Sequence, residues 1–459
     1  MPQRVAVLNV AGLSPSLFGS GLPRLGAFAR SCGGMRTIAP HLPAVTCTSQ
    51  ASILTGANPA RHGIVGNGWM DREAGEVRFW RQSNALMHGD KLWELARARD
   101  SRVTCANCFW WFNMFSSAEF EVTPRPCYLA DGRKIPDIAT RPGSLRDELQ
   151  SKLGPFPLFN FWGPRADITS TEWIAAAAIE VARKHQPTIQ LVYLPHLDYC
   201  LQKLGPNHPD IVMHLRALDR VIGALLDFYA NAGVRVVVLS EYGIAPVRGA
   251  VLPNRALREA GLLAVRDELG RDMVEPAAGA AFAVCDHQIA HVYVQRREQV
   301  AQVARILGAL DGVEQVLDSA AQEAVGIAHP RSGDLVLVSA SDRWFAYPFW
   351  LDDARAPDFA RTVDIHRKPG YDPCELFVDP RMALSGLRIA GKLLRRKLGL
   401  RALMDVIPLD PSLVRGSHGR VRNGHGLDPV LLVDDSHIED TEVPISQVGT
   451  AILSQVFPE

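Results

Sequence analysis

The sequence has no net charge and no long apolar run. Its 459 residues include 49 basic and 49 acidic side chains, so the charge balance gives no reason to expect nucleic acid as a partner. No stretch reaches the apolar length that a transmembrane helix needs. The first eight residues also lack the apolar core and cleavage site of a signal peptide and lead directly into a strand pattern. We therefore expect a cytoplasmic protein without a transmembrane segment.

The cysteines are few and irregularly spaced, which argues against a disulfide framework and against a zinc module. There are eight of them, with no repeated spacing. Cys105 and Cys108 form a Cys-x-x-Cys pair, but no second pair completes a zinc site, and Cys127 stands alone. We expect reduced thiols, with Cys105 and Cys108 buried beside an aromatic cluster.

Hydrophobic residues make up 47% of the chain, which is enough for a large core. Short apolar runs at 5–10, 188–194 and 235–239 predict buried parallel strands. Residues 217–232 predict an amphipathic helix closed by Gly233. The sequence therefore predicts an α/β fold, although its length alone admits one large domain with insertions or two domains.

The stretch 43–64 combines a proline, a run of hydroxyl side chains and a helical pattern. Pro43 cannot lie inside a central strand, so we expect a loop leading into a helix that starts near Thr48 or Ser49. A helix N-terminus presents unpaired N–H groups and a partial positive charge, which stabilise a bound anion. Thr46 would then stand where a hydroxyl can attack a phosphate or sulfate ester. The same composition also occurs where Ser and Thr only cap their own helix.

Three motifs in this stretch resemble a known nucleophile segment. They are Pro-x-x-Thr ending at Thr46, Leu-Thr-Gly at 54–56 and Pro-x-x-His-Gly-Ile at 59–64. Together they resemble the alkaline phosphatase superfamily, most closely its type I phosphodiesterase/nucleotide pyrophosphatase branch. The resemblance implies that Thr46 is the covalent nucleophile and touches a metal. The family's usual Asn three residues further on is Ser49 here, which keeps a hydroxyl donor of shorter reach as a second catalytic candidate.

The resemblance continues after later strands, with several metal-ligand positions altered. Asp198 lies in Asp-x-x-x-Gln-x-x-Gly-Pro, where the family has a histidine in place of Gln202. Glu241 and Tyr242 stand where the family has Asp-His, and His418, in Gly-Ser-His-Gly, matches its terminal ligand histidine. The resemblance implies Asp198, Glu241 and His418 as metal ligands. Gln202 and Tyr242 are then candidates for substrate contact.

The end of the first strand departs from the family as well. There the family carries Asp-Gly-Leu or Asp-Gly-Phe with the Asp on a metal, and the matching position is Ala11. Asn9, two residues earlier on the same strand face, can offer a carbonyl oxygen but no charge. We expect Asn9 in the substrate site. Trp69 is a further substrate candidate, since its segment borders the pocket in this family, with a packed surface hairpin as the equal alternative.

Several other histidines could add ligands. His287 follows an aspartate and could restore an Asp-His pair, and His291 lies four residues further on, on the same strand face. A hydrogen-bonded structural role is the alternative for His291. His366 lies in a Gly/Pro-rich stretch that either walls the pocket or forms an ordinary loop. His425, in Gly-His-Gly, is the local alternative to His418.

The resemblance implies a single domain over residues 1–459, with a three-layer αβα core, a mostly parallel sheet and the site at the carboxyl ends of the strands. We expect residues 67–165 to form an insertion or cap and residues 340–412 a second insertion near the pocket. Segment 384–404 is basic and amphipathic, so it either packs as an inserted helix or lies on an anionic membrane surface. Its narrow apolar face and the glycines that interrupt it favour packing.

These observations lead to a metal-assisted hydrolase or phosphoryl transferase that acts on a small phosphoester or phosphodiester. A divalent cation (Zn²⁺, Mn²⁺ or Mg²⁺) would neutralise the phosphate and lower the pKa of the Thr46 hydroxyl. The altered ligands weaken the case for a metal pair, so a single ion is the alternative to two. Two other functions stay open. One is an inactive or repurposed member that binds a phosphorylated ligand, and the other is a metal-independent biosynthetic enzyme.

Overall fold

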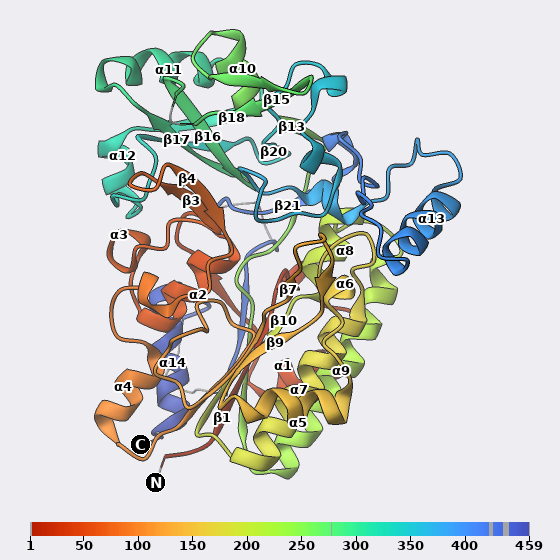
Figure 1. Ribbon diagram of the computed structural model, residues 1–459. Helices are drawn as coiled ribbons and strands as arrows, with labels where there is room; N and C mark the ends of the chain where they lie inside the picture. The colour runs from red at the N-terminus through yellow and green to blue at the C-terminus, as the bar shows by residue number, and fades with distance from the viewer. Residues whose placement is uncertain (1, 277, 422–425, 435–439, 459) are drawn as a thin grey trace.

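The chain folds around a nine-stranded central sheet, seen in the computed structural model of Figure 1. The structure describes residues 2–276, 278–421, 426–434 and 440–458. Across the sheet the strand order is β23-β2-β22-β11-β1-β10-β5-β6-β9. These strands are β1 (Val5–Val10), β2 (Arg36–Ala39), β5 (Cys105–Cys108), β6 (Phe120–Pro124), β9 (Ile138–Arg141), β10 (Ile189–Leu194), β11 (Arg235–Leu239), β22 (Val430–Leu432) and β23 (Glu442–Pro444). Neighbours run parallel except on both sides of β22 and between β6 and β9.

Helices cover both faces of this sheet, which gives three layers. Every residue of β1 and β10 is buried, as expected for strands covered on both faces. One face carries α1 (Pro23–Ser31), α5 (Ser144–Leu153), α7 (Ile168–His185) and α9 (Ile211–Asn231). The other face carries α2 (Thr46–Thr55), α4 (Leu92–Arg99) and α14 (Ile445–Val456). Helix α8 (His196–Leu204) begins directly after β10 and packs on α9.

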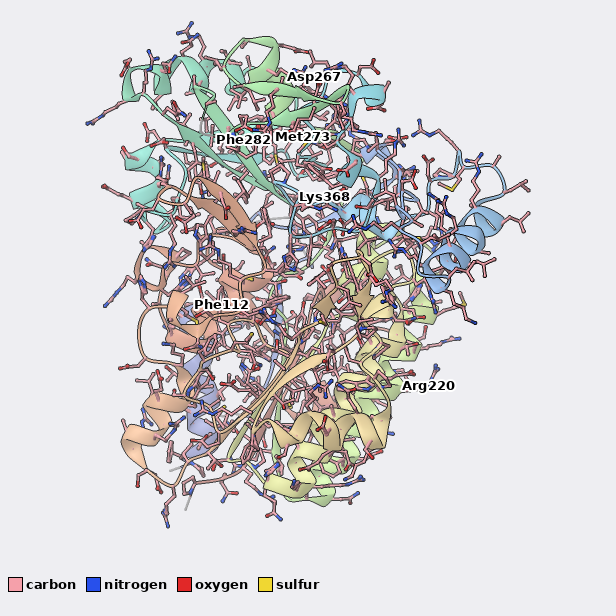
Figure 2. The ribbon with its side chains drawn as sticks, in the orientation of Figure 1. Phe112, Arg220, Asp267, Met273, Phe282 and Lys368 are labelled. Carbon is pink, nitrogen blue, oxygen red and sulfur yellow. The ribbon has the colours of Figure 1, made fainter. Side chains whose placement is uncertain are left out.

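A second, antiparallel sheet forms a separate lobe at the top of Figure 1, with strand order β16-β17-β19-β18. Its strands are β16 (Ala281–Asp286), β17 (Ile289–Val294), β18 (Val313–Leu317) and β19 (Leu335–Ser339), and its helices are α10 (Pro253–Glu259), α11 (Val300–Gly308) and α12 (Ser319–Ala324). This lobe has its own hydrophobic core. Figure 2 shows Phe282 among the side chains of the lobe, whereas Arg220 projects from α9 at the molecular surface.

The described chain has further strands and helices outside these two sheets and the helices already named. They are α3 (Pro59–His62), β3 (Gly68–Asp71), β4 (Glu76–Phe79), β7 (Cys127–Tyr128), β8 (Lys134–Ile135), α6 (Leu158–Phe161), β12 (Ala245–Pro246), β13 (Gly249–Val251), β14 (Val265–Glu268), β15 (Arg271–Val274), β20 (Arg343–Phe345), α13 (Ser385–Lys397) and β21 (Gly416–Ser417). Helix α13 stands out at the right edge of the molecule in Figure 1.

The predicted α/β class and the mostly parallel central sheet are confirmed. The division into core and insertions differs from the expected one. Residues 67–165 supply β5, β6 and β9 to the central sheet, and the separate sheet is built from residues 281–339. The physical reason is that β5 is four residues long and rich in Cys and Asn, so it lacks the long apolar run by which β1 was recognised.

All eight cysteines are free, and Cys105 and Cys108 are buried, as expected for thiols of the core. Within the described part of the chain, no helix combines the length and the apolar character needed to cross a bilayer.

Candidate active site

The carboxyl ends of parallel strands meet at one edge of the central sheet. Strand β1 lies between β10 and β11, and just beyond their ends Gly12 forms a bridge with Gly243. Gly12 has a φ of +80°, and a Cβ on Gly243 would lie 1.9 Å from the carbonyl oxygen of Leu427, so both positions need glycine. In open α/β sheets this edge is where ligands bind.

Thr46 is the first residue of α2 and lies at this edge. Its side chain is 4% exposed, and its hydroxyl lies 3.0 Å from the hydroxyl of Tyr242. The preceding residue, Val45, has no side-chain oxygen, so it cannot accept a hydrogen bond from the first N–H groups of the helix. One of them, the N–H of Cys47, donates to Asn67 Oδ1 at 3.0 Å. The helix therefore begins at Thr46, earlier than the start near Thr48 or Ser49 that the sequence predicted, and the Thr46 hydroxyl lies at the helix N-terminus, where an anion is stabilised.

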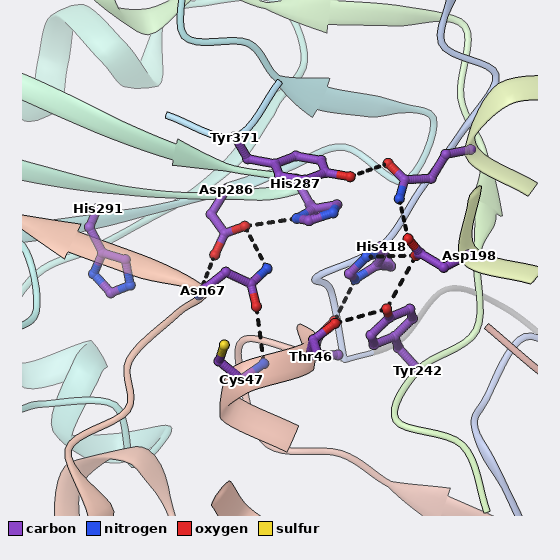
Figure 3. A network of polar contacts seen from close by, with 12 residues as sticks. Thr46, Cys47, Asn67, Asp198, Tyr242, Asp286, His287, His291, Tyr371 and His418 are labelled. Carbon is purple, nitrogen blue, oxygen red and sulfur yellow. Dashed lines mark hydrogen bonds and ion pairs between the residues drawn. The ribbon is translucent and has the colours of Figure 1, made fainter. Parts of the chain in front are cut away.

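The hydroxyls of Thr46 and Tyr242 form a directed chain that ends on Asp198 (Figure 3). Tyr242 donates to Asp198 Oδ1 at 3.2 Å. Tyr242 has a single proton, so while it donates to Asp198 it can only accept from the Thr46 hydroxyl, which also lies within reach of the Glu241 carboxyl group. Burial and the charge of Asp198 raise the pKa of Tyr242 well above its ordinary value, so the phenol keeps its proton at neutral pH. The order of donors is Thr46, Tyr242, Asp198.

Four rings form a continuous stack beside this chain. Tyr242 lies against His418 with ring centres 3.6 Å apart, His418 against His287 at 3.8 Å, and His287 against Tyr371 at 3.7 Å. Helix α8 connects the two ends of the stack through hydrogen bonds. Gln202 accepts from the Tyr371 hydroxyl at 2.9 Å and donates to Asp198 Oδ2 at 2.8 Å. Asp198 thus accepts a hydrogen bond from Tyr242 on one carboxylate oxygen and from Gln202 on the other.

His418 is oriented by the chain around Thr46. Its Nδ1 donates to the carbonyl oxygen of Ala44 at 2.9 Å, because a carbonyl can only accept. Its Nε2 faces Asp198 Oδ1 at 3.5 Å. A positive charge between His418 Nε2 and the Asp198 carboxylate would stabilise the two side chains at this distance. Either a proton on Nε2 or a metal cation can supply that charge. The spacing is close to that of two ligands on one divalent ion.

Glu241 adds a fully buried carboxyl group beside Thr46. Its Oε1 accepts from the side-chain amides of Asn9 and Gln50, and it also interacts with the Thr46 hydroxyl. Its Oε2 has no partner among the described residues. Burial raises the pKa of Glu241 to about 8, although the two amides and Thr46 act in the opposite direction.

The antiparallel lobe contributes the pair Asp286 and His287 to the same place. Asp286 accepts from the backbone N–H of Asn67 at 2.8 Å, from its side-chain amide at 3.0 Å and from His287 Nδ1 at 2.8 Å. Burial alone would raise the pKa of Asp286, but these hydrogen bonds hold it below its ordinary value. Burial and the neighbouring His418 lower the pKa of His287 to about 4, so the imidazole is neutral. His287 has a φ of +58°, a strained conformation for a residue with a side chain.

The structure thus brings Thr46, Asp198, Glu241 and His418 into one buried cluster, as the sequence predicts. Asn9, Gln202, Tyr242 and His287 belong to the same cluster. Ser49, one turn further along α2, is buried with a hydroxyl that has no partner among the described residues. The roles of these residues in chemistry remain predictions.

Other predicted residues lie apart. Trp69 is buried between the guanidinium groups of Arg81 and Arg331, at 5.3 and 5.1 Å from its ring centre. His366 packs edge-on against Tyr128 at 5.5 Å, and none of its contacts in the described chain reaches the cluster. Among the described residues, neither side chain forms a hydrogen bond, ion pair or ring contact with the cluster around Thr46.

His291 has the structural role that was its alternative. Its Nδ1 accepts from the N–H of Gly333 at 3.1 Å, and its Nε2 donates to the carbonyl of Val65 at 2.9 Å. His425 lies outside the described residues.

The described residues contain one group of three ligand-type side chains whose donor atoms all lie within 4.8 Å of one another. It consists of His196, Cys200 and His214. His196 and Cys200 share the face of α8 that packs on α9, opposite to the face of Asp198. The two imidazoles already form a hydrogen bond, with 3.1 Å between His196 Nε2 and His214 Nδ1. The group is therefore separate from the cluster around Thr46.

Two members of the cluster had no signal in the sequence that singled them out. Asn67 follows the Pro-x-x-His-Gly-Ile motif by three residues, and that closeness was the available clue. Tyr371 lies in a Pro-Gly-Tyr loop about 170 residues from its partner Gln202, without any periodic pattern. Long-range partners of this kind become visible only when the fold is known.

Comparison with known proteins points to one family. The sequence profile described as Type I phosphodiesterase / nucleotide pyrophosphatase matches residues 5–372. An uncharacterised pyrophosphatase/phosphodiesterase of Schizosaccharomyces pombe is 25% identical over 217 residues, which cover 45% of this chain and 37% of that protein. The aligned stretch therefore spans less than half of that relative.

Solved structures share the fold at low sequence identity. Phosphonoacetate hydrolase from Sinorhizobium meliloti 1021, in complex with phosphonoformate, aligns with a TM-score of 0.61 and 16% identity over 99% of this chain and 96% of its own. Murine ectonucleotide pyrophosphatase / phosphodiesterase 5, in an inactive form with AMP, aligns with a TM-score of 0.57 and 12% identity over 99% and 95% of the two chains. Both similarities establish the alkaline-phosphatase-like fold.

Proposed function

Since this chain belongs to the type I phosphodiesterase / nucleotide pyrophosphatase family, we propose that it cleaves or transfers a phosphoester or phosphodiester with Thr46 as its nucleophile. The substrate is a small phosphorylated molecule. Support comes from one observation above the others. The Thr46 hydroxyl donates to Tyr242, and Tyr242 donates to Asp198, so the nucleophile already has a path for its proton.

The first step follows from this order of donors. Thr46 Oγ1 forms a bond to phosphorus while the bond from phosphorus to the leaving oxygen breaks. The proton of Thr46 passes to the Tyr242 oxygen as the proton of Tyr242 passes to Asp198. Water then attacks the phosphorus of this covalent intermediate, and the bond from phosphorus to Thr46 Oγ1 breaks. The Thr46 oxygen recovers a proton from Asp198 through Tyr242, and the proton that the water loses goes to the departed oxyanion or to solvent. In a transferase an alcohol takes the place of water.

The start of α2 supports the charge of the phosphate. Val45 provides no cap, so the helix dipole and its first N–H groups are available to an anion at this end. The N–H of Cys47 is held by Asn67 Oδ1, and Asp286 holds Asn67 through two hydrogen bonds. We infer that the phosphate displaces Asn67 from this N–H when it binds.

Members of this family are typically metal-dependent, and the cluster offers donor atoms for a cation. His418 Nε2 and Asp198 Oδ1, 3.5 Å apart, are an imidazole and a carboxylate with a spacing that fits one divalent ion. The unpartnered Oε2 of Glu241 is a further buried oxygen donor. Tyr242 and Gln202 stand where the family has ligand histidines, but here they donate hydrogen bonds to Asp198 and offer no imidazole nitrogen to a metal. The ligand set of the cluster therefore favours a single Zn²⁺ or Mn²⁺ ion over a pair of ions. When bound, the ion would neutralise part of the phosphate charge.

A repurposed member that binds a phosphorylated ligand without turning it over is the second candidate. The observation in its favour is the closure of the cluster. Thr46 is 4% exposed, Asp198 7% and Tyr242 1%, so substrate must open a path to the nucleophile.

Isosteric variants of two threonines on the same helix separate these candidates. Thr46→Val removes the proposed nucleophile and keeps its shape, whereas Thr48→Val removes a buried hydroxyl that has no partner in the described structure. We expect turnover of bis(p-nitrophenyl) phosphate to fall by roughly three orders of magnitude in Thr46→Val and to stay near wild type in Thr48→Val. Thr46→Ser should keep measurable activity, and mass spectrometry of a quenched reaction should find a p-nitrophenyl phosphoryl group on residue 46.

Two results would decide against the nucleophile. Equal turnover by wild type, Thr46→Val and Thr48→Val would assign the activity to another group. No turnover by wild type, together with binding of phosphate that Thr46→Val retains, would favour the repurposed member.

A further inference from the structure

Helix α13 carries a stripe of exposed leucines along one side, continued by Leu398 directly after it, whereas Ile389 on the opposite side is half-buried. Leu387 is 70% exposed, Leu394 57% and Leu398 68%. At 100° per residue these three positions lie on one side of the helix within about 40° of one another. The arrangement is the reverse of a surface helix that packs its apolar stripe on a core.

The inner face of α13 is held by polar groups. Lys392 Nζ donates to the carbonyl of Leu403 at 2.8 Å and pairs with Asp405, and Arg396 Nε donates to the carbonyl of Ala402 at 3.0 Å. These contacts tie the helix to the segment that follows it. They fix which side points outward, so the exposure of the leucines is a property of the fold.

The apolar patch is concentrated in this one segment. Sixteen large hydrophobic side chains of the described chain are exposed, and seven of them lie between residues 384 and 403. They are Leu384, Leu387, Leu393, Leu394, Leu398, Leu400 and Leu403. Contiguous exposed apolar surface of this kind marks an interaction site.

The charge of the segment identifies the partner. Residues 384–404 contain six cations and no acidic residue, in a chain whose total charge is zero. Arg388 and Arg395 lie on one side of the leucine stripe and Lys397 on the other, as the helical spacing requires. An apolar stripe with cations along both borders matches a lipid surface, where acyl chains lie under a layer of anionic headgroups.

We propose that residues 384–404 dock the protein on an anionic membrane surface, with α13 lying in the plane of the headgroups. The leucines enter the boundary between headgroups and acyl chains, and the flanking arginines and lysine contact lipid phosphates. The sequence alone favoured packing of this helix on the protein. In the structure the leucine stripe faces solvent, so the helix does not use it to pack on the protein.

The test is cosedimentation of the full chain with phosphatidylcholine vesicles, with and without about a third of phosphatidylserine. We expect binding to the anionic vesicles, weaker binding to the neutral ones and release by salt. The triple variant Leu387→Ser/Leu394→Ser/Leu398→Ser removes the stripe, and Arg388→Gln/Arg395→Gln removes one border. Each should lower the affinity for anionic vesicles by roughly tenfold or more.

Matched controls use exposed residues elsewhere on the molecule. Leu95→Ser/Leu269→Ser/Leu351→Ser removes three exposed leucines, and Arg297→Gln/Arg305→Gln removes two exposed arginines of the antiparallel lobe. Both controls should bind like wild type, and all variants should keep the wild-type melting temperature.

Three outcomes would overturn the proposal. The first is a wild type that does not sediment with anionic vesicles, and the second is a stripe variant that binds these vesicles as well as wild type. The third is a dimer in light scattering that the stripe variant converts to a monomer while vesicles bind neither protein. That result would assign the patch to a second copy of the chain.

Discussion

The phenol ring of Tyr242 stacks on the imidazole of His418, with ring centres 3.6 Å apart and planes 2° from parallel. Both side chains also face the same oxygen, Oδ1 of Asp198, at 3.2 and 3.5 Å. The stack sets the distance between the Tyr242 hydroxyl and Thr46, so ring packing and proton path depend on each other. A substitution that keeps the ring and removes the hydroxyl separates these two roles.

Tyr242→Phe should keep the fold and lose activity. The ring still stacks on His418, so we expect a melting temperature close to that of wild type. The proton path from Thr46 to Asp198 is broken, and turnover of an aryl phosphodiester should fall by roughly 10²–10⁴-fold. Tyr371→Phe is the control, because Tyr371 closes the other end of the stack and bonds Gln202 rather than Thr46. Equal losses in both variants would show that the hydrogen-bond network around Asp198 as a whole, and not the Thr46–Tyr242 bond, limits the reaction.

Metal analysis should locate the cation. Two places offer donors, the pair Asp198–His418 and the group that includes Cys200 behind α8. The proposed function places the ion at the first, so His418→Gln should weaken Zn²⁺ or Mn²⁺ binding by roughly 100-fold. Cys200→Ser should leave binding and activity near wild type. Loss of the metal in Cys200→Ser, measured by elemental analysis of protein dialysed against chelator, would place the ion on the other side of the helix.

Lys368 should be a large contributor to stability, since it is a buried cation between two buried carboxylates. Its Nζ lies 2.7 Å from both Asp372 and Glu375. Burial alone would lower the pKa of Lys368, but the two carboxylates raise it, so the side chain is charged. Lys368→Met leaves the carboxylates unpaired, and we expect a loss of about 3–5 kcal/mol in the free energy of unfolding by urea. Lys152→Met breaks an exposed pair with Glu180 and should cost below about 1 kcal/mol.

The main lines of the fold and the centre of the site were predictable because they follow local rules. Apolar runs identified β1, β10 and β11, and Asp198 and Glu241 were found in motifs of the family resemblance that directly follow β10 and β11. Thr46 and His418 were found through motifs of the family resemblance. Each of these signals lies within a short window of sequence.

What escaped prediction depends on contacts between distant segments. Asp286 reaches Asn67 from 219 residues away, and this contact exists only because the antiparallel lobe packs against the central sheet. The direction of the leucines on α13 could not be predicted either, because periodicity identifies an apolar face without saying what it faces. Strand β5 was assigned to a cap for a similar reason, since four mixed residues carry no periodic signal.

His62 should make the protein less stable in mild acid. The sequence singled it out as part of a motif, and the structure holds it fully buried, with Nδ1 accepting from the N–H of Ile64 and Nε2 facing the hydroxyl of Ser52, both at 3.1 Å. Burial, with the neighbouring histidines second, lowers the pKa of His62 from 6.5 to about 3. Between these values the unfolded chain binds a proton that the folded protein does not, so stability falls as the pH drops below about 6.5.

The size of this effect and its test follow from the same linkage. One group with this shift should reduce the free energy of unfolding by about 2 kcal/mol between pH 7 and pH 5. His62→Asn keeps an acceptor for the N–H of Ile64 and does not titrate. The variant should be less stable than wild type at pH 7. Its free energy of unfolding by urea should change between pH 7 and pH 5 by about 2 kcal/mol less than that of wild type. An equal loss in wild type and His62→Asn would mean that other groups, such as the buried His291, carry the acid sensitivity instead.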